Sequence, residues 1–245
     1  MAKSPAVKPD YGVDAPAVMR NLFLFGGFLW LLVFTTPAHI HIGPVDLLFH
    51  YPLGWTGSFL LVEGFLFLIY VKFGKFRHRD FMLSLHRWRG DEHVLDVGCG
   101  RGLLLAGAAK LVPDGHATGI DVWSNVDMGA NSAEATQHNL DLEGIAGRCS
   151  LVSAGAQQMP FEDASFDVIV SNLCLHNIYD KPTRQRAVAE IARVLRPGGL
   201  ALISDYKLTA AYAALFREMG FVVTMKWGSF ATTFPPLRVV IARKP

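Results

Sequence analysis

The chain has few cysteines and few charged residues, and each shortage excludes a class of protein. Its three cysteines, Cys99, Cys149 and Cys174, are scattered and form no CxxC pair, which predicts free thiols in a reducing compartment. Only 18% of the residues are charged and the net charge is +2, against about 25% charged residues in an average soluble domain. We therefore predict neither a metal site nor a nucleic-acid partner.

Charge is missing above all from two long segments near the N-terminus. Residues Asn21–Thr36 carry no charge, and Leu53–Val71 are interrupted only by Glu63. At about 1.5 Å per helical residue, the second segment can cross a hydrocarbon core of about 30 Å, whereas the first reaches about 24 Å unless Ala17–Met19 join it. We predict a two-helix transmembrane hairpin over residues 20–74, with helices at about 20–37 and 53–73, after a loose N-terminal tail at 1–19.

Flanking charge predicts the orientation of this hairpin. The connector Ala38–Pro52 holds no Lys or Arg, while basic residues stand before the first segment and after the second: Lys3, Lys8, Arg20, Lys72, Lys75, Arg77, Arg79, Arg87 and Arg89. By the positive-inside rule both ends are cytoplasmic. We expect an integral membrane protein with membrane lipid as a partner and its main domain on the cytoplasmic side. The alternatives are two packed helices of a soluble protein and a hairpin that enters one leaflet only.

Four polar residues in this region each have two interpretations. Glu63, an acid inside an apolar helix, indicates a functional site. We favour a structural role, in which it is protonated or bonds the first helix near Gly26–Gly27. His39 and His41 share one face of an extended connector and, with His50, raise the question of a metal site. The connector offers no further ligands, so we favour histidines at the membrane interface.

From about Arg77 the pattern changes to that of a soluble domain, beginning with an amphipathic helix at Phe81–Arg89. The strands that follow are predicted at Val94–Val97, Ala117–Val122, Ser150–Ser153, Phe166–Ser171, Leu200–Asp205, Phe221–Trp227 and Arg238–Arg243. Helices are predicted between them at Leu103–Leu111, Ala130–Glu143, Thr183–Leu195 and Thr209–Met219. This alternation predicts an α/β domain over residues 77–245, a doubly wound, mostly parallel seven-stranded sheet with helices on both faces. The last two strands are close in sequence, so we expect one antiparallel strand at the edge.

One motif carries most of the functional information. Residues Val94–Gly102 read VLDVGCGRG, an apolar strand that enters a loop with glycine at positions 98, 100 and 102, and an apolar helix follows. Strand, glycine loop and helix form a nucleotide-binding crevice at the carboxyl end of a parallel strand. Asp121 ends the next apolar run about twenty residues on, where a carboxylate accepts hydrogen bonds from both ribose hydroxyls.

The spacing of the loop separates two kinds of cofactor. A dinucleotide fingerprint, G-x-G-x-x-G, sets a helix N-terminus against a pyrophosphate. Here the third glycine comes one residue early and Asp96 precedes the first. A carboxylate on the loop suits a cationic ligand and repels a pyrophosphate. The motif resembles motif I of the class I S-adenosylmethionine-dependent methyltransferases, whose ligand carries a sulfonium and an ammonium.

Later motifs follow the order of that family. Ala154–Phe161, AGAQQMPF, resembles a stretch whose acidic residue contacts adenine; here that position is Gly155, so adenine recognition falls to backbone near Ala156, with help from Gln157. Asn172 matches the polar residue at the tip of the fourth strand. The resemblance implies a Rossmann-like fold and S-adenosyl-L-methionine as cofactor. The cofactor-binding residues that it implies are Asp96, Gly98, Cys99, Gly100, Gly102, Asp121, Val122, Ala156, Gln157 and Asn172.

The catalytic candidates are His176, Asp205 and Tyr206, which lie near predicted strand tips. A methyl acceptor with a high pKa needs a base, and His176 follows the fourth strand, where the family often meets its acceptor. A capping or packing role is the favoured alternative for His176, and a surface turn is an equal alternative for the other two. Cys174 is a candidate thiol site, but we favour a small buried residue.

The combined prediction is a membrane-anchored, S-adenosylmethionine-dependent methyltransferase whose acceptor is an apolar small molecule: a quinone, an isoprenoid or a lipid. One alternative is a methyltransferase of a small thiol or metalloid. A non-catalytic cofactor-binding membrane protein is the second, and the retained Asp96, Asp121 and Asn172 oppose it. An NAD-dependent oxidoreductase is the third, and the glycine spacing opposes it.

Overall fold

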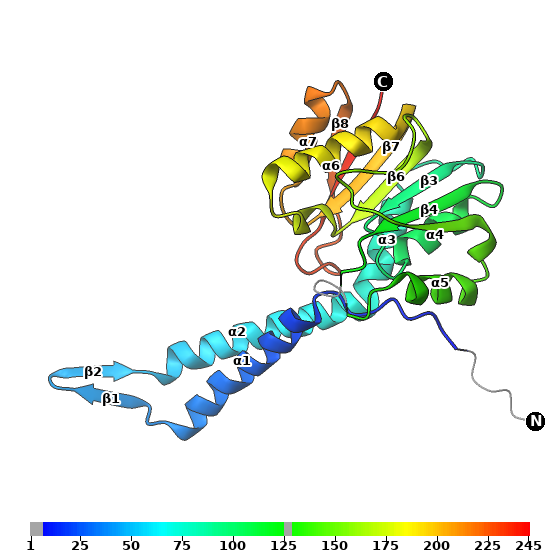
Figure 1. Cartoon of the computed structure of the whole chain (residues 1–245). Coiled ribbons are helices and arrows are strands. Elements are labelled where there is room, and N and C mark those ends of the chain that lie inside the picture. Colours follow the sequence, from blue (N-terminus) through cyan, green and yellow to red (C-terminus); the bar gives the residue numbers. More distant parts are fainter. Residues whose placement is uncertain (1–6, 125–128) are drawn as a thin grey trace, which may run out of the picture.

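The main domain is built on one seven-stranded sheet, seen in a computed structural model that describes residues 7–124 and 129–245 (Figure 1). The strand order is β5-β4-β3-β6-β7-β9-β8, and only β9 runs against its neighbours. The predicted mostly parallel seven-stranded sheet is confirmed. The antiparallel strand, however, lies between β7 and β8 and not at the edge. The bounds are β3 His93–Val97, β4 His116–Asp121, β5 Cys149–Ser153, β6 Phe166–Asn172, β7 Leu195–Asp205, β8 Val222–Trp227 and β9 Arg238–Arg243.

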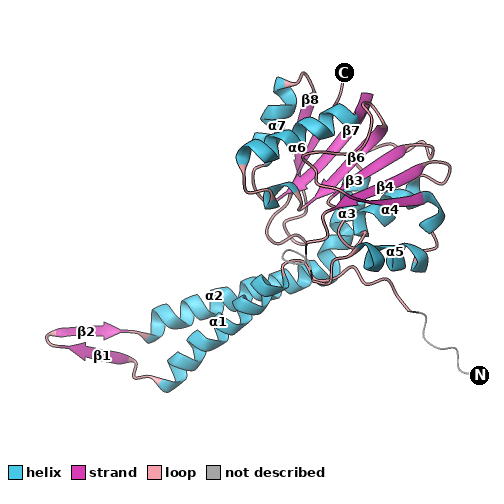
Figure 2. Ribbon diagram, in the orientation of Figure 1, coloured by secondary structure: helices cyan, strands magenta, loops and turns pink. Residues whose placement is uncertain are grey.

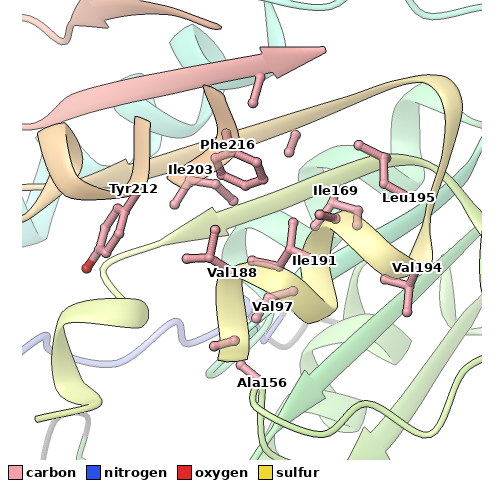
Figure 3. Packing of buried hydrophobic residues seen from close by; sticks show 14 of the residues in the cluster. Val97, Ala156, Ile169, Val188, Ile191, Val194, Leu195, Ile203, Tyr212 and Phe216 are labelled. Atoms are coloured by element: carbon pink, nitrogen blue, oxygen red, sulfur yellow. The ribbon is translucent and has the colours of Figure 1, made fainter. Parts of the chain in front are cut away.

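Helices cover both faces of this sheet (Figure 2). Successive strand residues point to opposite faces, so Ile169 of β6 joins one hydrophobic cluster and its neighbours Val168 and Val170 join the other. Figure 3 shows the first cluster, in which Val188 and Phe216 reach the sheet from two different helices. Helices α6 (Lys181–Val194) and α7 (Thr209–Glu218) cover that face, and α3 (Lys75–Leu83), α4 (Leu103–Leu111) and α5 (Ala133–Leu142) cover the other.

Two long helices project from the domain side by side (Figure 1). They are α1 (Pro16–Thr35) and α2 (His50–Ile69), and a small antiparallel hairpin, β1 (His39–Ile42) with β2 (Val45–Leu48), joins their far ends. A π-helical turn, Tyr70–Gly74, then connects α2 directly to α3. We name the ends of α1 and α2 next to the sheet domain, with this turn, the hairpin foot.

Several observed boundaries differ from the predicted ones. α1 begins at Pro16, which suits the first turn of a helix because proline lacks only an N–H that would have no partner there. Helix α3 ends at Leu83, so most of the expected helix at 81–89 is a loop. The buried carboxylate of Glu92 holds this loop by accepting the backbone N–H groups of Arg89 and Gly90.

Glycines set the contact between α1 and α2. A Cβ on Gly26 would stand 3.0 Å from the carbonyl oxygen of Gly57, and one on Gly57 would meet Trp30 and Gly26. The expected bond from Glu63 to Gly26–Gly27 is not seen: within the described residues Glu63 has no hydrogen bond or ion pair, and no atom lies within 4 Å of a Cβ on Gly27. Backbone approach therefore joins the two helices without help from Glu63.

One helix in the described part of the chain, Pro16–Thr35, is long and apolar enough to cross a membrane by length and composition alone. The uncharged segment Asn21–Thr36, within the helix predicted at about 20–37, is by itself short of a hydrocarbon core. Because α1 starts four residues before the predicted boundary and has 20 residues, it is about 30 Å long.

Candidate active site

A cavity of about 660 Å³ lies at the carboxyl ends of β3, β4 and β6. That is the end of a parallel sheet where α/β folds bind ligands, and the volume is within the usual range of about 300–1,000 Å³. A recess of about 60 Å³ adjoins it and shares Asp14, Tyr70, Gly98 and Asn172 with it. Of the predicted cofactor residues, the cavity is lined by Gly98, Gly100, Asp121, Val122, Ala156, Gln157 and Asn172, and the recess by Asp96, Cys99 and again Gly98 and Asn172.

The glycine loop is fixed to β4 by its backbone. Gly98 and Gly100 have φ values of +73° and +50°, which glycine adopts without strain. The N–H of Gly100 donates to Oδ2 of Asp121 at 2.8 Å, and Trp123 N–H donates to Oδ1 at 2.7 Å. A Cβ on Gly98 would stand 2.3 Å from Sγ of Cys174, so this glycine makes room for the chain after β6.

Four buried polar atoms of the recess make no hydrogen bond of good geometry in the described structure: Tyr70 Oη, Asp96 Oδ2, Arg101 Nε and Asn172 Oδ1. Tyr70 and Asn172 interact weakly with each other, which leaves Asp96 and Arg101 as the least satisfied pair. Buried polar groups are normally paired, so this concentration indicates a place for a polar ligand. The set combines acceptors for an ammonium group with a guanidinium donor for a carboxylate. It fits the amino-acid end of S-adenosylmethionine.

Asp96 is the most perturbed acid of the recess. It is 1% exposed, and its burial raises its carboxyl pKa to about 8, with the charge of Asp121 adding to the rise. The backbone N–H of Leu105 offsets part of this rise, but Oδ2 of Asp96 has no hydrogen-bond partner among the described residues. An incompletely paired buried carboxylate is costly, and a cation beside it removes that cost. This is the electrostatic environment that the loop sequence predicts for a cationic ligand.

The N-terminal segment closes the recess, a role that the sequence did not predict. Where a loose tail was expected, Tyr11 is buried and donates its hydroxyl to Glu143 at 2.6 Å, and Asp10 pairs with Arg101 at 3.1 Å. The buried ammonium of Lys75 donates to the carbonyls of Tyr11 and Gly12 at 2.9 and 2.6 Å. No local sequence pattern predicts these contacts, because they join positions more than sixty residues apart.

At the opposite end of the cavity, Gln157 takes the place of the missing acid. A Cβ on Gly155 would lie 2.5 Å from Oε1 of Gln157, so the amide of Gln157 fills the space where a side chain at 155 would begin. Ala156 is buried and Val122 is exposed at this end of the cavity.

The other predicted residues of this region lie behind the loop. Gly102 ends the loop at the start of α4, next to Thr136, and is not part of the cavity lining. The side chain of Cys99 packs under the loop against Gly119. Burial raises the pKa of the Cys99 and Cys174 thiols far above the usual value, so neither forms a thiolate at neutral pH.

The structure brings the three catalytic candidates together. Nδ1 of His176 lies 2.9 Å from Oδ1 of Asp205, and the carboxylate is 1% exposed. The angle at Nδ1 does not meet hydrogen-bond geometry, so the two groups are in contact without a formed hydrogen bond. Tyr206 packs edge to face on His176, with 4.8 Å between ring centroids. The backbone N–H of Tyr206 donates to Oδ1 of Asp205. His176 and Tyr206 both line the cavity.

Comparison with known proteins agrees with this architecture. Residues 95–203 match a methyltransferase domain family. The chain is 35% identical over 162 residues to a demethylmenaquinone methyltransferase of Symbiobacterium thermophilum. This match covers 65% of this chain and 57% of that protein. It is 34% identical over 129 residues to a ubiquinone/menaquinone biosynthesis C-methyltransferase of Vibrio campbellii, covering 52% and 46%. The matches therefore span about half the length of these relatives.

A solved structure shows the same fold. An S-adenosylmethionine-dependent methyltransferase from Aquifex aeolicus superposes with a TM-score of 0.55 and 18% identity, covering 68% of this chain and 89% of that one. Residues 95–203 thus match a methyltransferase domain, and the fold and motif order are those of the class I S-adenosylmethionine-dependent methyltransferases. S-adenosylmethionine is the cofactor that this domain implies.

Proposed function

We propose that the chain is a membrane-associated methyltransferase whose acceptor is an apolar small molecule of the quinone class. One observation carries this proposal: a single cavity combines the cofactor loop, the His176–Asp205 pair and an apolar wall from the hairpin foot. The names of the two relatives, a demethylmenaquinone methyltransferase and a ubiquinone/menaquinone C-methyltransferase, support the same acceptor class.

The surface of the helical pair supports membrane association. α1 buries only Gly26, and α2 only Gly57, Gly64 and Phe67. Apolar side chains cover the outside of both helices: Leu24, Phe25, Phe28, Leu31, Phe34, Trp55, Phe59, Val62, Phe65, Leu66 and Ile69. Soluble monomers rarely expose apolar patches beyond a few hundred Å². A hairpin within the bilayer, with the sheet domain on the cytoplasmic side, accounts for this surface and for the absence of Lys and Arg between residues 21 and 71.

We assign the cofactor along the cavity in three parts. Asp96, Arg101, Tyr70 and Asn172 hold the amino-acid end in the recess, and Asp121 receives the ribose hydroxyls. Ala156 and Gln157, with Val122, border the adenine. When bound, the cofactor supplies an electrophilic methyl group on a positively charged sulfur.

The contribution of the chain to the reaction is to hold the acceptor and to remove its proton. Asp205 orients His176 through Nδ1, which leaves Nε2 as the nitrogen that serves the acceptor. His176 thus acts as a general base, a role that contributes about 10²–10⁴-fold in rate. A thiol or metalloid acceptor has less support, because the Cys174 thiol is protonated and the described residues hold no group of three potential metal ligands.

The test is a methyl-transfer assay with the full chain in lipid vesicles, labelled S-adenosylmethionine and demethylmenaquinol, the hydroquinone form kept reduced by dithionite. The reduced form is used because an electrophilic methyl group reacts with the electron-rich hydroquinone ring after loss of a proton, and not with the oxidised quinone. We expect transfer to the hydroquinone ring, a loss of kcat of about 10²-fold or more for His176→Ala, and cofactor affinity in that variant within about twofold of wild type. His138→Ala, on the exposed face of α5, is the matched control. Cofactor binding without transfer to the quinone would reject the acceptor class, and an unchanged kcat for His176→Ala would reject the base.

A further inference from the structure

The cavity has two openings, which its exposed lining residues reveal. Val122 is 66% exposed and lies beside the predicted adenine region, so this opening faces solvent. Val18 of α1 is 52% exposed and also lines the cavity, so a second opening lies at the hairpin foot. A polar cofactor and an apolar acceptor therefore have separate approaches to the same cavity.

The wall at the second opening is apolar and belongs to the hairpin foot. Phe67 and Tyr70 line the cavity and pack in one cluster with Leu173, from the loop after β6. Pro235, from the loop before β9, lines the cavity as well. The residues that seat the hairpin on the sheet domain are thus the ones that face the cavity.

The apolar surface continues from this opening along both helices. Phe25 lies two turns from Val18 on the same face of α1 and is exposed. On α2, Leu66 and Ile69 are exposed on the helix face next to that of Phe67. A chain leaving the cavity at Val18 passes Asn21, one turn further along α1, and then reaches the apolar side chain of Phe25. A chain leaving at Val122 reaches water next to the cofactor.

We propose that the foot of the hairpin is the binding and entry site for the acceptor's apolar tail, a polyprenyl or long alkyl chain. The inference rests on the proposed function for the identity of the acceptor. The tail passes between Val18 and Phe67 and follows the hairpin into lipid, while the ring reaches His176. Val18 and Phe67 then determine specificity for tailed acceptors.

The first test compares two acceptors with the same ring, one with a long prenyl tail and one without a tail. Val18→Trp narrows the opening, so we expect the ratio of kcat/KM for the tailed to the tail-less acceptor to fall at least tenfold. Val62→Trp is the matched control, because Val62 is an exposed valine of the same hairpin outside the cavity lining. It should leave the ratio within twofold. An unchanged ratio for Val18→Trp would overturn the inference.

The second test does not depend on turnover. A quinone with a photoreactive group at the end of a long alkyl tail is crosslinked to the full chain in vesicles, and the labelled peptides are mapped. We expect labels within residues 15–25 and 66–70, competed by unmodified long-chain quinone. Labels concentrated near Val122 or Tyr179 would overturn the inference. Labelling at the foot without any methyl transfer would support the tail site and reject the proposed function.

Discussion

At the residue scale, Asp121 holds the loop as well as the proposed ribose site. Its oxygens accept hydrogen bonds from Gly100, Trp123 and Asn131. Asp121→Ala therefore removes both the acceptor for the ribose hydroxyls and the hydrogen bonds that hold the glycine loop. We expect a loss of about 1.5–3 kcal/mol in S-adenosylmethionine binding, about tenfold to a hundredfold. Isothermal titration calorimetry measures this, with the exposed Asp141→Ala as control. Wild-type affinity in Asp121→Ala would place the ribose elsewhere.

Asp96 makes cofactor binding depend on pH. Its pKa of about 8 in the free protein means that the carboxyl is largely protonated at pH 6–7, and a bound cation favours the ionised form. Affinity for S-adenosylmethionine should therefore rise between about pH 6 and 8. Asp96→Asn should bind more weakly and lose this rise. An equal rise in the variant would assign the pH dependence to a group other than Asp96.

The motif residues of the site could be predicted from the sequence, but the rest of the recess could not. Asp96, Gly98 and Asp121 lie in or directly after strands, so local pattern fixes their place. Tyr11 and Tyr70 reach the recess only through tertiary packing of the N-terminal segment and the π-helical turn. Single-sequence patterns carry no signal for contacts of that kind.

At the scale of elements, α3 docks on the sheet through a neutral histidine. His78 is buried, its Nε2 lies 2.7 Å from Oγ of Ser204 in β7, and burial lowers its pKa to about 4. Because this pKa is below the unfolded value of about 6.5, its stabilisation is present above pH 6.5 and is lost as pH falls toward 4.

Chemical unfolding of the full chain in detergent at pH 7 and pH 4.5 checks this role. We expect His78→Gln to be less stable than wild type at pH 7 and to show a smaller acid-induced loss, with a difference of up to about 3 kcal/mol. His138→Gln should behave as wild type. Identical pH dependence in wild type and His78→Gln would contradict the assignment.

Elements were predictable where one periodicity extends over a whole segment. The glycine-loop strand and α4 lie within a residue of the predicted positions, because the apolar run and Gly102 mark them. The position of β9 in the sheet depends on its pairing with β7 and β8. Such pairing between segments distant in sequence cannot be predicted from a local pattern. Helix α3 ends early because Glu92 binds the loop that follows, and a helical periodicity cannot reveal such a contact.

At the scale of the whole molecule, the hairpin and the site are one unit. Removing residues 1–74 would also remove Tyr11, Asp14 and Tyr70 from the recess. We expect that truncation to lose most cofactor affinity.

Replacing residues 23–64 with a flexible Gly/Ser linker keeps the hairpin foot. The resulting protein should be soluble without detergent, bind cofactor within a fewfold of wild type, and lose most activity on vesicle-bound quinone. Fractionation and calorimetry measure these effects; wild-type protein found soluble without detergent would contradict the membrane assignment.

The most direct measurement follows a labelled methyl group into a total membrane lipid extract. The full chain in vesicles is incubated with isotopically labelled S-adenosylmethionine and the extract, and the products are separated into organic and aqueous phases and identified by mass spectrometry. Transfer to an apolar acceptor predicts the label in the organic phase, as one added methyl group on a quinone-type ring. Label confined to water-soluble products, or no transfer by protein that binds the cofactor, would contradict it.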